Sequence, residues 1–149
     1  IAKYTTKISL PGPTGESNII RYKPKGTALC LGPTAIDALK QTLLALALGS
    51  SVISLIHEDE YNSLITLGFD KENIFRLVNG PSLKLMKSES YKVILFFGNL
   101  MSVEKLIVNQ RSVITPIMSS LTETWQLLNE RVITEDTTAS GGNANLLAL

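Results

Sequence analysis

The sequence has one cysteine, one histidine and few aromatic residues, and each shortage excludes a class of function. One cysteine cannot form an internal disulfide, which is consistent with a reducing, cytoplasmic compartment. One tryptophan, four tyrosines and four phenylalanines, without a basic run among them, offer no stacking platform for nucleic acid. Fourteen basic and 13 acidic residues give a net charge of +1. The composition therefore predicts no nucleic-acid partner for this domain.

Long apolar runs are also missing. The longest uninterrupted one, Leu43 to Gly49, is far shorter than the roughly 18 residues that a membrane span requires, so no span is predicted. No charged-then-apolar leader opens the sequence. The chain begins with Ile1 rather than methionine, and we expect it to be part of a longer protein.

The stretch from Gly26 to Glu58 predicts the unit around which the rest of the chain is arranged. A short apolar run before Gly32-Pro33 is typical of a strand buried on both faces. Thr34, followed three residues later by Asp37, resembles a helix-capping box. Apolar residues then recur at the spacing of an amphipathic helix that ends at Gly49: Ile36, Leu39, Leu43, Leu46 and Ala47. With the apolar run Val52 to Ile56, this pattern predicts a right-handed strand–helix–strand unit with parallel strands.

The same alternation continues through most of the chain. The further elements predicted are a helix at 58–67, a strand at 73–78, a short helix at 81–86, a strand at 91–97, a helix at 101–110, a strand at 113–117, a helix or helical turn at 121–128 and a sixth strand at 130–134. This order predicts an α/β fold with a doubly wound, mostly parallel, Rossmann-like sheet. We assign 1–25 to an extended arm or flap strands, 26–134 to the α/β domain, and 135–149 to a C-terminal motif segment.

Doubly wound sheets bind ligands at the carboxyl ends of their strands, and the sequence places little chemistry there. The turn Leu31 to Thr34 lacks the three glycines of a dinucleotide fingerprint, although a phosphate at the following helix start is physically allowed. Cys30 lies inside a strand and is expected to be a protonated core residue. His57 before three acidic residues is read as a helix start rather than a metal site. Asn79 stands where a phosphoacceptor domain needs a carboxylate. The sequence predicts no catalytic, cofactor-binding or metal-binding residue.

Four segments resemble a known family. They are Leu10 to Asn18, Pro24 to Leu31, the Glu130-Arg131 pair and Thr137 to Ala144. Together they resemble the carboxyl-terminal domain of proline utilization A, a bacterial family of bifunctional oxidoreductases that oxidise proline to glutamate with FAD and NAD. The resemblance covers nearly the whole chain. It implies an additional domain that is similar to the nucleotide-binding half of aldehyde dehydrogenases.

The departures from working aldehyde dehydrogenases imply an inactive relative. Gly32-Pro33-Thr34 stands in place of their Pro-Trp-Asn type segment, and Leu55-Ile56-His57 in place of a strand ending in a ribose-binding lysine. Gly98 of their Gly-Ser pair is kept, but Asn99 replaces the serine. Segments carrying their glutamate base and thiol nucleophile have no counterpart. The resemblance therefore implies that this chain itself is inactive and holds no cofactor, whereas the parent enzyme uses FAD and NAD.

The resemblance also implies a role for the closing segment. In the family this motif is associated with a flap over the dehydrogenase module, which helps enclose the cavity that passes the intermediate between active sites. The implied interface or lid residues are Thr137, Thr138, Gly141, Gly142, Asn143 and Ala144. The implied partner is the dehydrogenase module of the parent chain, and a homo-oligomer is left open.

Three hypotheses follow from the sequence. The first is a noncatalytic scaffold or lid domain in a bifunctional proline-oxidising enzyme, and we favour it. The second is a residual nucleotide-binding or regulatory module, supported by the intact sheet pattern. The third is a free-standing flavodoxin-like signalling or binding domain, which would make the end motifs coincidental.

Overall fold

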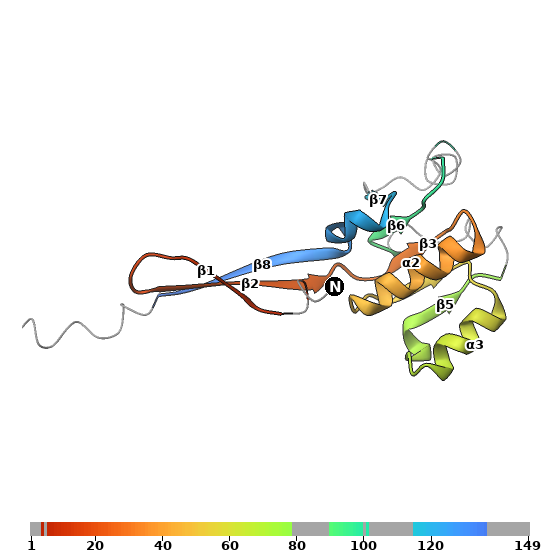
Figure 1. Cartoon of the computed structure of the whole chain (residues 1–149), viewed down its shortest axis with the longest axis horizontal. Helices are drawn as coiled ribbons and strands as arrows, with labels where there is room; N and C mark the ends of the chain where they lie inside the picture. The colour runs from red at the N-terminus through yellow and green to blue at the C-terminus, as the bar shows by residue number, and fades with distance from the viewer. Residues whose placement is uncertain (1–3, 5, 79–89, 100, 102–114, 137–149) are drawn as a thin grey trace, which may run out of the picture. The chain divides into compact units, whose positions relative to one another are not determined.

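The computed structural model describes residues 4, 6–78, 90–99, 101 and 115–136 (Figure 1). The chain divides into two compact units: Ile1–Lys23 with Glu130–Leu149, and Pro24–Asn129. One sheet has three strands in the order β1-β2-β8, and the other has five in the order β5-β4-β3-β6-β7. The predicted helices at 81–86 and 101–110 lie outside the described residues, apart from Met101.

The three-stranded sheet begins as a hairpin. β1 (Ile8–Leu10) pairs antiparallel with β2 (Glu16–Pro24), with Ile8 opposite Ile20. Between them, the Glu16 amide donates to the Pro13 carbonyl at 3.0 Å. This hairpin agrees with the extended arm and the turn that the sequence predicts for this region. β8 (Leu128–Asp136) is the third strand and lies beside β2.

The prediction that residues 130–134 form a sixth strand of the parallel sheet is wrong. These residues form a strand, but it is part of β8 in the three-stranded sheet. In β8 only Leu128 is buried, and every later residue of the strand is exposed. A strand inside a parallel sheet is covered on both faces, and the charged side chains of Glu130 and Arg131 do not suit that environment.

The five-stranded sheet confirms the predicted parallel α/β core. β3 (Ala28–Cys30) lies between β4 (Val52–Ser54) and β6 (Val93–Leu95), and all residues of these three strands are buried. β5 (Ile74–Arg76) and β7 (Ile117–Met118) are the outer strands. Every described pairing in this sheet is parallel. The chain thus moves outward from β3 to β5 and returns to β6 on the other side of β3, as in dinucleotide-binding folds.

The described helices begin and end close to where the sequence predicts. α2 (Ala35–Ala47) lies against β3 and β4, and α3 (Glu58–Thr66) follows β4 (Figure 1). Both helices are followed by a glycine with a positive φ, Gly49 and Gly68. Two 3₁₀ segments complete the set, η1 (Lys71–Asn73) and η5 (Leu121–Leu127). None of the helices in the described ranges is long and apolar enough to cross a membrane.

The side of α2 that faces the sheet differs from the apolar side of its sequence pattern. Its buried residues are Ala38, Gln41, Thr42 and Ala45. Ile36 and Leu43, which the amphipathic pattern would turn inward, are 65% and 36% exposed. The two buried alanines are small, so the helix backbone can lie close to β3 and β4. The Thr42 hydroxyl is within 2.7 Å of both the Ala38 carbonyl and the Ser54 hydroxyl, which satisfies it in the core.

Candidate functional site

The topological switch point, where the strand order reverses between β3 and β6, is the place at which this fold binds ligands. Two loops meet there, one after β3 and one after β6. The Leu31 amide donates to the Leu95 carbonyl at 3.0 Å, and the Phe97 amide donates to the Gly32 carbonyl at 2.9 Å. Backbone hydrogen bonds therefore join the two loops beyond the ends of the strands.

The side chain of Gln41, in α2, holds the loop between β3 and α2 through two hydrogen bonds to Gly32. Its Nε2 donates to the Gly32 carbonyl at 2.7 Å, and its Oε1 accepts from the Gly32 amide at 3.0 Å. The Gln41 side chain is completely buried. Gly32 has a φ of +93°, and a Cβ there would lie 2.9 Å from the Thr34 nitrogen, so the loop needs glycine. The Gly32 amide is thus already bound by the Gln41 carboxamide and is not free to bind a ligand.

The start of α2 carries a negative charge of its own. Thr34 is the N-cap, and its hydroxyl accepts from the Asp37 amide at 3.1 Å, as the capping pattern predicts. The same hydroxyl donates to the Asp37 carboxylate at 2.7 Å. A carboxylate in the first turn is stabilised by the helix dipole. It would repel a phosphate placed at the same helix end.

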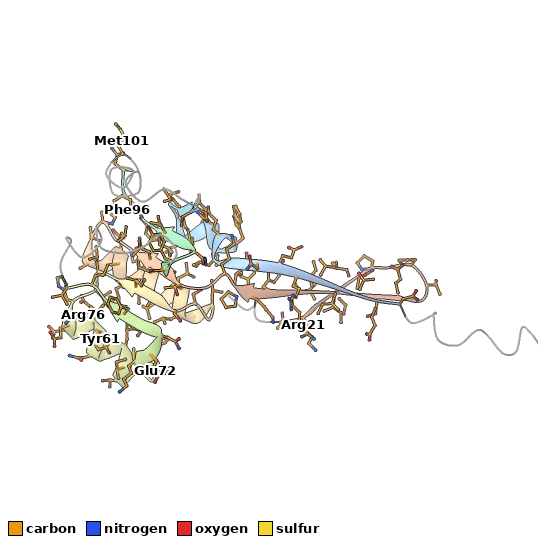
Figure 2. The ribbon with its side chains drawn as sticks, turned by 180° about the vertical axis from the view of Figure 1, so that it is seen from behind. Arg21, Tyr61, Glu72, Arg76, Phe96 and Met101 are labelled. Atoms are coloured by element: carbon orange, nitrogen blue, oxygen red, sulfur yellow. The ribbon has the colours of Figure 1, made fainter. Side chains whose placement is uncertain are left out.

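The loop after β6 is packed against the loop after β3. Phe96, labelled in Figure 2, follows β6 and is 8% exposed. A Cβ added to Gly98 would lie 2.9 Å from the Phe96 ring and 3.1 Å from Pro33 Cγ. The Oδ1 of Asn99 accepts a hydrogen bond from the Met101 amide at 3.0 Å. The space beside Gly98 is therefore occupied by side chains of the protein.

Three features of this loop and helix start oppose the binding of a dinucleotide. A pyrophosphate at this edge of the sheet needs free backbone amides and a closely approaching glycine turn. Here the Gly32 amide is bound by Gln41, Pro33 has no amide, and Asp37 places a carboxylate at the helix start.

Cys30 is a core residue, as predicted. It lies in β3 with 0% exposure. Burial raises the pKa of its thiol from 9.0 to about 12, and a hydrogen bond with Thr42 offsets only part of that increase. At neutral pH the thiol is protonated, and the protonated form is a poor nucleophile.

His57 occupies the N-cap position of α3, which agrees with its interpretation as a helix start. The three acidic residues after it form the first turn of the helix. One of them, Glu58, accepts a hydrogen bond from Arg76 of β5 at 3.3 Å. Within the described ranges, no three histidine, cysteine, aspartate or glutamate side chains are grouped so that they could hold a metal ion.

The remaining predicted site residues lie outside the described part of the chain. They are the six lid residues Thr137, Thr138, Gly141, Gly142, Asn143 and Ala144, and Asn79, which argued against a phosphoacceptor site, is likewise outside. In contrast, Gln41 is central to the loop geometry, and the sequence reasoning missed it. A signal was present, because Gln41 and Thr42 lie between Ala38 and Ala45 at the spacing of one helix face. Polar residues on a face with alanines indicate a face that packs closely and makes buried hydrogen bonds.

Sequence comparison finds two curated relatives. The bifunctional protein PutA of Salmonella typhimurium is 27% identical over 157 aligned residues, and that of Escherichia coli is 25% identical over 160. The chain is similar to PutA along its whole length. It spans only 12% of the length of either PutA relative. No protein-family model matches the chain.

Structural comparison also finds PutA, together with an aldehyde dehydrogenase. Proline utilization A of Bradyrhizobium japonicum matches 76% of this chain with a TM-score of 0.64 and 22% identity, over 13% of its own chain. A betaine aldehyde dehydrogenase of Staphylococcus aureus, solved with NAD+, matches 74% with a TM-score of 0.61 and 18% identity, over 25% of its chain. The resemblance to PutA and the aldehyde dehydrogenase-like fold that the sequence predicts are confirmed.

Proposed function

We propose that this chain is a noncatalytic scaffold or lid domain of a cytoplasmic, bifunctional enzyme that oxidises L-proline to L-glutamate. In that enzyme it helps to enclose the cavity through which the intermediate passes between active sites. The chemistry belongs to other modules of the parent chain, which bind FAD and NAD. The dehydrogenase module of the same polypeptide is the partner of this domain.

The observation that carries this proposal is the similarity of the whole sequence to PutA, together with a switch point at which the protein's own side chains contact both Gly32 and Gly98. Gln41 binds both backbone groups of Gly32, and Pro33 and Phe96 occupy the space beside Gly98. A sheet that keeps its nucleotide-binding strand order while filling the binding position supports a structural role. The buried, protonated Cys30 supports the same conclusion, because it cannot serve as the thiol of an aldehyde dehydrogenase.

The lid role rests on the predicted interface residues between Thr137 and Ala144. Their hydroxyl, amide and glycine content suits extended pairing with a neighbouring module, as in strand addition. Residues 1–25, with β1 and β2, and the 135–149 segment are proposed to act at the boundary with that module, while the five-stranded sheet and its helices within 26–134 provide the scaffold.

Deletion of Thr137 to Leu149 from the full-length enzyme tests the lid. Each half-reaction is expected to keep its rate when supplied with its own substrate. Conversion of proline to glutamate is expected to slow and to show a lag, because the intermediate escapes to solvent. A truncated enzyme with no lag and an unchanged overall rate would show that the segment is not a lid.

The alternative is a residual nucleotide-binding or regulatory module. The similarity in fold to an NAD+-bound betaine aldehyde dehydrogenase is the observation in its favour. Titration calorimetry of this 149-residue chain with NAD separates the two functions. The scaffold proposal predicts no heat of binding, and saturable binding in the micromolar range would favour the alternative.

A further inference from the structure

The outward side of α2 is apolar, although nothing in the described residues covers it. Ile36, Lys40, Leu43 and Ala47 are all exposed and recur at intervals of three or four residues, so they form one stripe along the helix. Ile36 is 65% and Leu43 is 36% exposed. Leu39 and Leu46 border the stripe and are half-buried. We call these six residues the α2 outer face.

This arrangement is the reverse of an ordinary surface helix, which turns its large aliphatic residues to the core and its polar residues to water. In α2 the sheet side holds two alanines, a glutamine and a threonine, and the hydrogen bonds of Gln41 with Gly32 and of Thr42 with Ser54 fix which side faces in. Rotating the helix to bury Ile36 would break those bonds. The sequence of α2 therefore specifies an inner side that packs on the sheet and an apolar outer side that is suited to contact with a further protein surface.

The length of the relatives supports another part of the same polypeptide as the partner that covers the α2 outer face. The chain aligns over its whole length with PutA proteins but spans 12% of them, so most of such a polypeptide is available to cover an exposed face. Lys40 lies within the stripe, and a buried ammonium group needs an anionic partner. The stripe does not suit pairing with lipid, because a membrane-surface helix normally carries a strongly charged opposite face.

We propose that the α2 outer face is a docking surface for another module of the same polypeptide, one that presents aliphatic side chains and a carboxylate opposite Lys40. This proposal shares one premise with the proposed function, namely that the chain is part of a longer protein. It assigns to α2 a contact separate from the predicted lid segment at Thr137 to Ala144.

Thiol labelling in the full-length polypeptide tests the docking surface. The Ile36→Cys variant is compared with Leu67→Cys, a matched control because Leu67 follows α3 and is 74% exposed. The rate of maleimide addition at each position is measured by peptide mass spectrometry, which separates these thiols from the native ones. We expect the Ile36→Cys position to react at least tenfold more slowly than the Leu67→Cys position, at every protein concentration.

Three results would overturn the proposal. Equal labelling rates at the two positions would mean that the α2 outer face is free in the full-length protein. Protection that disappears on dilution would identify a second copy as the occupant. Protection that disappears when residues 137–149 are deleted would identify the chain's own closing segment. The lag measured for proline oxidation is a separate readout, so a failed lid proposal and a failed docking proposal are distinguishable.

Discussion

Gln41 is the residue that couples the first helix to the first strand of the α/β unit. Its amide group satisfies both backbone groups of Gly32 inside the core. Sequence patterns did predict the neighbouring Thr34–Asp37 cap and the burial of Cys30, because both depend on local spacing or on position within an apolar run. Periodicity can place Gln41 on the buried face of α2, but its contact with Gly32, nine positions away, depends on how the helix lies on the sheet.

Replacement of Gln41 by alanine tests this coupling. The Gly32 amide would be left buried without its partner, and we expect the free energy of unfolding to fall by about 1–3 kcal/mol. Urea unfolding of the 149-residue chain measures the change. The control is Lys40→Ala, at an exposed position on the same helix, which should shift the value by no more than about 0.5 kcal/mol. Equal effects of the two substitutions would contradict the role given to Gln41.

Cys30 gives the second prediction at this scale, a pH dependence. The thiol has a pKa of about 12 in the folded chain, against 9.0 as the ordinary value, so the folded state holds its proton more tightly. The resulting stability is fully present below pH 9 and is lost as pH rises from 9 towards 12. Between those values, the unfolding free energy of the native chain should fall more steeply than that of Cys30→Ala. Parallel curves for the two proteins would show that the thiol is not buried as described.

At the scale of elements, the sequence predicted the position of most described strands but not always their sheet. β7 (Ile117–Met118) shares only Ile117 with the strand predicted at 113–117. The runs that contain β3, β4 and β6 are mostly apolar and rich in branched residues, as strands buried on both faces are. Residues 130–134 also read as a strand, yet a short strand pattern does not reveal its neighbours. Pairing of β8 with β2 joins residues near opposite ends of the chain, and no local pattern encodes it.

The inner position of β6 predicts a large effect of truncation. Ile94 is 0% exposed and lies between β3 and β7, so Ile94→Ala should lower the free energy of unfolding by about 2–5 kcal/mol. Phe75 on the outer strand β5 is 63% exposed and serves as the control, with an expected loss below about 1 kcal/mol. Denaturant midpoints of the two variants provide the comparison, and a larger loss for Phe75→Ala would be incompatible with this strand order.

For the whole molecule, the Gly32 amide bound by Gln41 and the buried Cys30 thiol predict that the chain alone has no aldehyde oxidation activity. The purified 149-residue chain, given glutamate semialdehyde and NAD, should produce no NADH above background, which absorbance at the reduced-nicotinamide band measures. The Cys30→Ala variant serves as the blank. A rate that is present in the native chain and absent from this variant would refute the assignment of Cys30 to the core.

The strand order of the three-stranded sheet also determines when that sheet can form during synthesis. β1 and β2 leave the ribosome first, but their third strand, β8, follows the whole of Pro24–Asn129. At typical translation rates that interval lasts roughly 5–20 s. A two-stranded hairpin is marginally stable by itself, and the unpaired side of β2 is open to other strands for that time. The three-stranded sheet therefore closes only after the five-stranded sheet has been synthesised, and until then the free edge of β2 needs protection from other strands.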